Sequence, residues 1–338
     1  DWKTPKELEL NLKDCTSCVD IIRFAVNPRK LAKIKKYLEI TKKLGFTVAV
    51  NLMYVHLSLK DKKIILNVIK LNKYFDILYL VDSYGTLIPG DVGNIIEKIK
   101  LIDKNIKIGF HSHNNLELAL SNTIEAINHK VDFVDCTFTG MGRGAGNLKT
   151  ELLLSYLGIK LNKIKIKNFK NIGNVVDKFE DIRTEEKWGA TLPYMISAST
   201  NSPQSEAMQL IKSKRYNMTD IVTYLFKKKG KKINIIKNLN FKKKDVLIVG
   251  GGTSVKKKIN YLQEFLKENK NVFVIFSSSR NIDLFEDLSA RSVLCIAGNE
   301  ILKINKIFFK KNKFIINNLV DDKTLLPKKI QNFFNLKK

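Results

Sequence analysis

The stretch Gly109-Phe110-His111-Ser112-His113-Asn114-Asn115 decides how this chain is interpreted. It follows a strand-like run over residues 105–110 and precedes a helix-like run that begins near Leu116. Side chains alternate between the two faces of a strand, so His111 and His113 should point the same way. Two imidazoles at one strand end can share a metal ion, which predicts a metal site there.

The same layout recurs immediately downstream. Residues 131–138 are strand-like, and the glycine-rich turn Gly140-Met141-Gly142-Arg143-Gly144-Ala145-Gly146-Asn147 leads into a helix from about residue 149. Three further strand-then-helix units precede these two, with strands expected over residues 19–26, 46–55 and 75–82. Strands that alternate with helices predict a parallel sheet, and in a (β/α) barrel the chemistry lies at the strand C-termini.

Five such units do not close an eight-stranded barrel. We therefore expect an α/β fold with a partial (β/α)8 TIM barrel over residues 1–160 whose first strands are missing; an open sheet is the alternative. The first residue is Asp1 rather than Met, so we expect a fragment with an incomplete N-terminus. Residues 161–240 are expected to form a helical extension and a lysine-rich linker.

The last part of the chain, residues 241–338, predicts a Rossmann-like α/β domain. A strand over 245–249 runs into Gly250-Gly251-Gly252-Thr253-Ser254, and an amphipathic helix follows. Backbone amides in this turn could bind a phosphate, with Gly250, Gly252 and Ser254 as candidate cofactor-binding residues. The full G-x-G-x-x-G spacing is absent, so a phosphate, a nucleotide-linked ligand and a packing role for the glycines all stay open.

The composition limits the classes of function. The net charge is +27, but only seven of the 60 basic residues are arginine, the better phosphate and base reader. The lysines are spread along the whole chain, so we do not expect nucleic-acid binding. No apolar run is long enough to cross a bilayer, and no secretory signal is visible. Four cysteines do not suggest a disulfide framework, and we expect a cytoplasmic protein.

Polar residues follow or occupy three successive strands. Asp82 and Ser83 lie at one strand end, Asn51 lies in the preceding strand, and Asn147 in the glycine-rich turn can offer a carbonyl oxygen. Such residues are hard to explain as parts of an apolar core. They indicate either a polar site at the strand ends or a set of loop caps.

The stretches Val81-Asp82-Ser83-Tyr84-Gly85, Gly109 to Asn115 and Gly140 to Asn147 resemble one enzyme superfamily. This is the metal-dependent aldolase and Claisen-condensing superfamily, which includes 4-hydroxy-2-oxovalerate aldolase, hydroxymethylglutaryl-CoA lyase, isopropylmalate synthase and the pyruvate carboxyltransferase domain. The resemblance covers roughly residues 19–157. It implies a TIM barrel that binds a divalent metal, usually Mg²⁺, Mn²⁺ or Zn²⁺.

The resemblance also implies roles for individual residues. His111, His113 and Asn147 would be metal ligands, and the catalytic candidates are Asn51, Asp82, Ser83 and Arg143. A small pyruvate-like 2-oxo acid would bind the metal, and a metal-stabilised enolate would gain or lose a carbon partner. We expect an aldolase, lyase or acyl-condensing enzyme that forms a homo-oligomer.

One departure from the family pattern affects these expectations. The first strand of the family supplies an aspartate ligand and a neighbouring arginine, and we expect that strand to be absent here. The remaining three ligands are neutral, whereas hard divalent cations prefer charged oxygen, so we expect poor metal affinity and little activity. The alternatives are a catalytically inactive barrel that serves as a binding or assembly module, and a lysine-rich nucleic-acid-binding protein.

Overall fold

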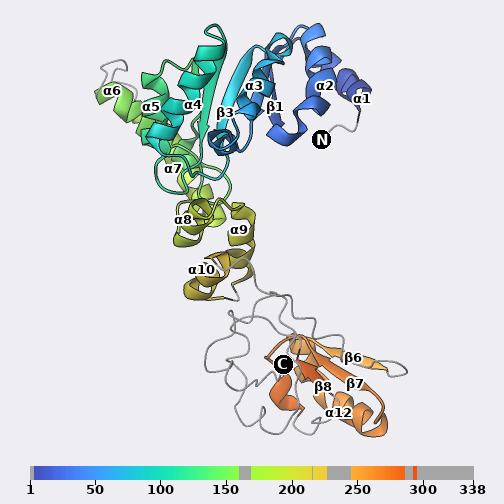
Figure 1. Cartoon of the computed structure of the whole chain (residues 1–338). Helices are drawn as coiled ribbons and strands as arrows, with labels where there is room; N and C mark the ends of the chain where they lie inside the picture. Colours follow the sequence, from blue (N-terminus) through green and yellow to red (C-terminus); the bar gives the residue numbers. More distant parts are fainter. Residues whose placement is uncertain (1–3, 160–168, 215, 227–244, 286–291, 295–338) are drawn as a thin grey trace. The chain divides into compact units, whose positions relative to one another are not determined.

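The computed structural model describes residues 4–159, 169–214, 216–226, 245–285 and 292–294. Contacts divide the chain into two compact units, Asp1–Ser205 and Glu206–Lys338. Figure 1 shows the helices and strands of both units.

The first unit is built on a sheet of five parallel strands that lie side by side in chain order. They are β1 (Ile21–Val26), β2 (Thr47–Leu52), β3 (Ile77–Asp82), β4 (Lys107–Ser112) and β5 (Phe133–Val134). This order confirms the prediction of consecutive parallel strands. It is the order expected when each strand is followed by a right-handed crossover through a helix.

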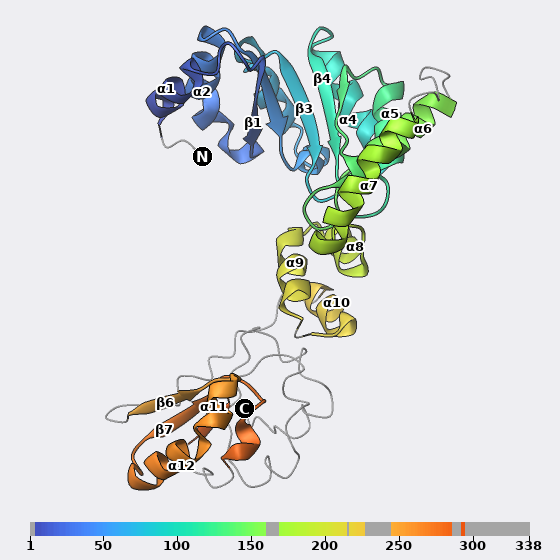
Figure 2. The ribbon, with the colours of Figure 1, turned by 180° about the vertical axis from the view of Figure 1, so that it is seen from behind.

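Helices and short 3-10 turns connect the strands. In chain order they are α1 (Pro5–Lys13), η1 (Pro28–Lys30), α2 (Leu31–Lys43), η2 (Val55–Leu59), α3 (Lys63–Ile69), η3 (Asn72–Tyr74), α4 (Pro89–Ile102), α5 (Ala119–Asn128), η4 (Phe138–Gly140) and α6 (Thr150–Ile159). Figure 2 shows the same elements from behind, with α4 and α5 packed beside β4.

The two faces of the sheet have different environments because side chains alternate along each strand. Even-numbered residues such as Val50, Leu78 and Ile108 are fully or almost fully buried in the main core, together with helix residues such as Leu38 and Ile96. Every residue of β3 is buried, as expected for a central parallel strand. Odd-numbered strand residues face the other side of the sheet, and this second face carries the polar side chains of the site.

β5 is much shorter than the predicted strand over 131–138. It pairs with β4 only at Phe133 and Val134. Further along, Thr137 forms a bridge with Lys149 in the segment that follows the glycine-rich turn. The backbone at Thr137 therefore pairs with the segment after the glycine-rich turn and not with the sheet.

The helical extension follows the sheet. It comprises α7 (Phe169–Glu186), α8 (Leu192–Ser199), α9 (Gln204–Ser213) and α10 (Met218–Phe226), and α9 crosses the boundary between the two units. Trp188 to Ala190, expected among helices, lie in the connection between α7 and α8.

The second unit contains a three-stranded parallel sheet, in the order β6 (Val246–Val249), β7 (Phe273–Phe276) and β8 (Ser292–Leu294). Two helices, α11 (Thr253–Lys257) and α12 (Ile259–Glu268), connect β6 to β7. This α/β arrangement agrees with the predicted domain type. The lysine-rich segment 227–244 and residues 295–338 of the predicted Rossmann-like domain lie outside the described residues.

The glycine turn of this second sheet is held from within the unit. Nδ2 of Asn281 donates to the carbonyl oxygens of Gly250 at 2.8 Å and Gly252 at 3.2 Å. Asn281 is almost fully buried. These bonds give the turn a fixed form, while ligand binding by Gly250, Gly252 and Ser254 stays a prediction.

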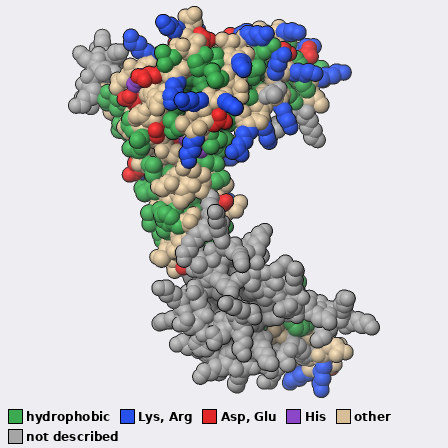
Figure 3. All heavy atoms as spheres, in the orientation of Figure 1, with side chains coloured by type: hydrophobic (Ala, Val, Ile, Leu, Met, Phe, Trp, Pro, Cys, Tyr) green, Lys and Arg blue, Asp and Glu red, His purple; other side chains and the backbone are tan. Residues whose placement is uncertain are grey.

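The surface of the first unit is mixed in charge on the side drawn in Figure 3, where Lys and Arg side chains are scattered with Asp and Glu between them. Among the helices in the described ranges, none combines the length and the apolar character needed to span a membrane.

Candidate metal and substrate site

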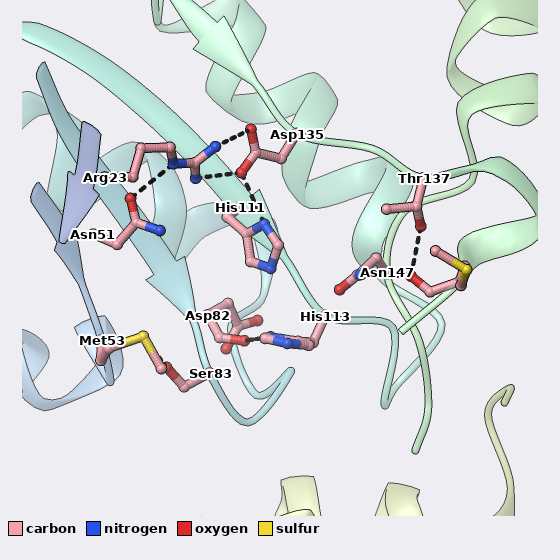
Figure 4. Close-up of polar contacts among 11 residues, drawn as sticks. Arg23, Asn51, Met53, Asp82, Ser83, His111, His113, Asp135, Thr137 and Asn147 are labelled. Carbon is pink, nitrogen blue, oxygen red and sulfur yellow. Dashed lines mark hydrogen bonds and ion pairs between the residues drawn. The ribbon is translucent and has the colours of Figure 1, made fainter. Parts of the chain in front are cut away.

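Polar side chains from four strands or strand ends meet on the face of the first sheet that carries the odd-numbered strand residues, which we call the open face (Figure 4). His111 lies on β4, and Asp135 follows β5. Nδ1 of His111 is 2.9 Å from Oδ2 of Asp135. Because a carboxylate only accepts hydrogen bonds, we assign the ring proton to Nδ1. This assignment leaves the lone pair of Nε2 available for a metal ion.

His113 lies one residue beyond the end of β4 and is oriented in a similar way. Its Nδ1 is 2.8 Å from the backbone oxygen of Asp82, which can only accept a hydrogen bond. The ring centroids of His111 and His113 are 5.0 Å apart. Burial and the neighbouring His111 lower the pKa of His113 to about 4, so this imidazole is neutral at physiological pH. In metal-binding histidines, one ring nitrogen usually forms a hydrogen bond with the protein while the other binds the metal.

Asn147 supplies a possible third donor. Its Nδ2 donates to the carbonyl oxygen of Met141 at 2.9 Å, while its Oδ1 is buried with no hydrogen-bond partner among the described residues. A backbone bridge pairs Asn147 with His113, which brings the amide beside the two imidazoles. A buried acceptor without a partner requires one, and a cation would satisfy it.

The donor set fits a divalent cation through two imidazole nitrogens and one amide oxygen. No group of three or more His, Cys, Asp or Glu side chains in the described part of the chain is placed to hold a metal. All three donors are neutral, so weak binding of the ion stays a prediction.

The glycine-rich turn gives Asn147 its position. Gly140 and Gly146 have φ angles of +71° and +77°, which residues other than glycine rarely adopt. A Cβ atom on Gly146 would overlap the carbonyl oxygen of Gly140. The amide of Asn147 donates to that same oxygen at 3.0 Å, and the amide of Asn114 donates to the carbonyl of Gly146 at 2.9 Å.

The helical extension holds the turn from outside. The amide of Gln204 donates to the carbonyl of Arg143 at 3.2 Å, and its oxygen lies 3.3 Å from both the backbone nitrogen of Ala145 and Nδ2 of Asn115. Nε1 of the buried Trp188 donates to the carbonyl of Thr139 at 3.0 Å. These contacts were not foreseen from the sequence, because nothing in the local pattern links residues so far apart.

Asp82 and Ser83 lie next to the histidines, but their side chains are used within the loops. The carboxylate of Asp82 accepts the backbone N–H groups of Thr86 at 3.0 Å and Leu87 at 3.2 Å. Burial raises the pKa of Asp82 to about 6, against the opposing effect of these amides. Ser83 Oγ accepts the N–H of Tyr54 at 2.8 Å. Both side chains therefore bond to the backbone of the neighbouring loops.

The other two catalytic candidates differ in position. Asn51 faces the site from β2, where its Oδ1 accepts a hydrogen bond from Arg23 Nε at 3.1 Å. Arg143 has an exposed side chain, and its carbonyl oxygen is the group that contacts the extension.

Three residues of the site were not identified from the sequence, which are Arg23, Tyr79 and Asp135. Arg23 forms a two-point ion pair with Asp135, at 3.1 and 2.6 Å, and its Cζ lies 3.8 Å from the ring centroid of Tyr79. Gly109 lies opposite Tyr79 in the sheet, where the absence of a side chain leaves room for the ring. Burial opposes the negative charge of Asp135, but His111 and Arg23 outweigh it and hold the pKa below its usual value. The available signal was a charged residue within the apolar strand Ile21–Val26.

Comparisons with known proteins show which proteins this chain is similar to. Residues 26–176 match the HMGL-like family. A 4-hydroxy-2-oxovalerate aldolase from Geobacillus genomosp. 3 is 34% identical over 155 residues, which are 46% of this chain and 44% of that protein. An oxaloacetate decarboxylase from Mycobacterium tuberculosis is 32% identical over 139 residues, 41% of each protein. The chain thus spans less than half the length of these curated relatives.

A solved structure extends the match. The crystal structure of the N-terminal domain of a Bacteroides vulgatus protein, provisionally described as an aldolase, is 35% identical with a TM-score of 0.59. The match covers 65% of this chain and 72% of that one. Strands β2 to β5, the histidine pair and the glycine-rich turn all lie within the matched residues 26–176. The chain therefore belongs to the HMGL-like family of aldolase-type barrel proteins.

Proposed function

We propose that this chain provides the catalytic face of a metal-dependent aldolase or lyase. It would form or cleave a carbon–carbon bond of a small, pyruvate-like 2-oxo acid. Relatives named for 4-hydroxy-2-oxovalerate and for oxaloacetate support this proposal, because both compounds are 2-oxo acids. The single observation that carries it is the pair of imidazoles with Nδ1 engaged and Nε2 available, beside the unpartnered oxygen of Asn147.

In the proposed reaction, His111, His113 and Asn147 hold a divalent ion, Mn²⁺, Mg²⁺ or Zn²⁺. When bound, the ion would polarise the 2-oxo carbonyl and stabilise the negative charge that develops on its oxygen. The protein residues keep the donors in place. Asp135 holds the proton on Nδ1 of His111, and the carbonyl of Asp82 does the same for His113.

Arg23 and Asn51 contribute to binding in this proposal. Three of the five N–H groups of Arg23 point to Asp135 and Asn51, which leaves two donors for the carboxylate of a 2-oxo acid. The ring of Tyr79 lies against the guanidinium and limits its movement. Ser83, with Tyr54 and Met53, shapes the rim of the site.

The test is pyruvate release from 4-hydroxy-2-oxovalerate and from oxaloacetate, measured on the 338-residue protein with Mn²⁺, Mg²⁺, Zn²⁺ or chelator. We expect slow, metal-dependent release that His113→Ala abolishes. His129→Ala is the matched control, because His129 lies at the end of α5 and contacts Glu97 and Glu125. Chelator-resistant release would contradict the proposal.

The second candidate is an inactive barrel that binds a ligand or a partner. It is favoured by the neutral donor set, since in the described part of the chain no carboxylate is placed to bind a metal together with the two imidazoles. Electron paramagnetic resonance of added Mn²⁺ separates the two: binding lost in His113→Ala but without turnover would support the inactive barrel.

Further parts of the proposal concern the whole protein. We propose domains at 1–160, 161–240 and 241–338, a homo-oligomer in the cytoplasm, and a phosphate or nucleotide-linked ligand at Gly250, Gly252 and Ser254. The chain composition does not favour nucleic acid as a partner.

A further inference from the structure

A second pocket of about 530 Å³ lies in the first unit, beside the loops that follow β1, β2 and β3 and the end of α8. It is distinct from the metal site, since His111, His113 and Asn147 do not line it. The residues that matter for its chemistry are Arg29, Tyr54, His56, Lys60, Tyr84 and Asp91. We name it the aromatic pocket. Its volume is in the range of small-molecule sites.

Three rings form one side of the aromatic pocket. The centroids of His56 and Tyr84 are 5.0 Å apart with their planes inclined at 34°, and those of Tyr54 and Tyr84 are 5.2 Å apart. The backbone N–H of Tyr54 donates to Oγ of Ser83, which fixes the start of the loop that follows β2. Such a wall offers the face or edge of a ring to a planar ligand.

His56 adds an unmet hydrogen-bonding need. Its side chain is 9% exposed, and its buried Nδ1 has no hydrogen-bond partner among the described residues. Burial, with Lys60 nearby, lowers the pKa of His56 and keeps the ring neutral. A neutral imidazole buried without a partner carries a desolvation cost, which a polar group of a ligand would offset.

The charged groups of the pocket favour an anion. Arg29 and Lys60 are both exposed lining residues. The acidic lining residue, Asp91, already accepts the backbone N–H of Ile88 at 3.3 Å at the start of α4. Among the residues that line the pocket, positive charges therefore exceed negative charges by one.

We propose that the aromatic pocket binds a small planar ring that carries an anionic group. The ring lies against Tyr84 and His56, a polar atom of the ligand meets Nδ1 of His56, and the anionic group pairs with Arg29 or Lys60. An aromatic carboxylate and a nucleotide share this chemistry. The inference is independent of turnover at the metal site.

The test is isothermal titration of the full protein in the presence of chelator with three probes. Benzoate has the ring and the charge, benzamide has the ring alone, and acetate has the charge alone. We expect benzoate to bind about 5-fold more tightly than either, since each part adds roughly 1 kcal/mol. Adenosine 5′-monophosphate then separates the two sources: tighter binding than benzoate identifies a nucleotide, and weaker binding an aromatic carboxylate.

Variants locate the binding. Lys60→Gln should weaken benzoate about 3-fold and leave benzamide unchanged, as expected for an exposed ion pair. Lys70→Gln is the matched control, because Lys70 is exposed at the end of α3 and does not line the pocket. Tyr84→Leu should weaken both ring probes. Equal binding of benzoate and acetate, or loss of benzoate binding in His113→Ala with Tyr84→Leu unaffected, would overturn the proposal.

Discussion

Asp135 and Arg23 meet in a two-point ion pair across the open face of the sheet, although 112 residues separate them in the chain. The same carboxylate holds Nδ1 of His111. Asp135 is thus both the ion-pair partner of Arg23 and the group that orients the ring of His111. Removing its charge should affect the metal site more than the fold.

The first prediction is that Asp135→Asn weakens Mn²⁺ binding roughly 10- to 100-fold, as is usual for groups that orient a metal-binding histidine. Titration followed by electron paramagnetic resonance measures this change. Asp132→Asn is the matched control, because Asp132 accepts the N–H of Ile108 at 2.8 Å and does not touch the histidines. Equal losses in the two variants would show that Asp135 has no special part in orienting His111.

The second prediction compares two glycines with positive φ angles. Gly146→Ala should abolish Mn²⁺ binding, since the new Cβ overlaps the Gly140 carbonyl and displaces Asn147. Gly45→Ala, at φ +90° with no atom within 4 Å of the new Cβ, should cost only about 1–2 kcal/mol of backbone strain. Urea unfolding followed by circular dichroism checks stability, and Mn²⁺ titration checks the site. Retained Mn²⁺ binding in Gly146→Ala would remove Asn147 from the ligand set.

The third prediction concerns pH in the metal-free protein. The pKa of Asp82 is raised to about 6, so the folded state takes up its proton first, and acidification from pH 6 to 4 adds stability. The pKa of His113 is lowered to about 4, so the unfolded chain is protonated first, and the same acidification removes stability. Asp82→Asn removes the first contribution and leaves the second.

The stability of Asp82→Asn should therefore fall more steeply than that of the unaltered protein between pH 6.5 and 4.5, by about 2 kcal/mol. Urea midpoints at several pH values, taken with chelator, give the comparison. Asp61→Asn is a control at an exposed carboxylate near the start of α3. Parallel pH profiles for Asp82→Asn and the unaltered protein would show that burial does not raise the pKa of Asp82.

The fourth prediction concerns Trp188. Trp188→Phe keeps a ring in the buried site but removes the bond to the Thr139 carbonyl, which should cost about 1–3 kcal/mol. The glycine-rich turn should then exchange its amide hydrogens faster, with the sheet unaffected. Hydrogen exchange read by mass spectrometry tests this, and uniform protection in both proteins would mean that Trp188 does not hold the turn.

The sequence was sufficient for the features that depend on local periodicity. Strand alternation predicted that His111 and His113 share a side, and the repeated strand–helix pattern predicted the order of the strands. The Arg23–Asp135 pair could not be predicted in this way. The alternation of side chains shows which face of the sheet a residue is on, but not which distant residue it contacts across that face. The short β5 was missed for a related reason: an apolar run fixes the type of element but not where its pairing ends.

The contacts of Gln204 also bear on how the protein is assembled. Neighbouring strands of the first sheet are neighbours in the chain, so the sheet can form from contacts of low sequence separation. Gln204, in contrast, reaches back 89 residues to Asn115 and 59 residues to Ala145. During synthesis the strands leave the ribosome well before α9 exists, so the nascent sheet can fold while the turn that carries Asn147 is still unclamped. Completion of the proposed metal site would then be the last step in the folding of this unit, and it would depend on a helix that supplies none of the proposed donors.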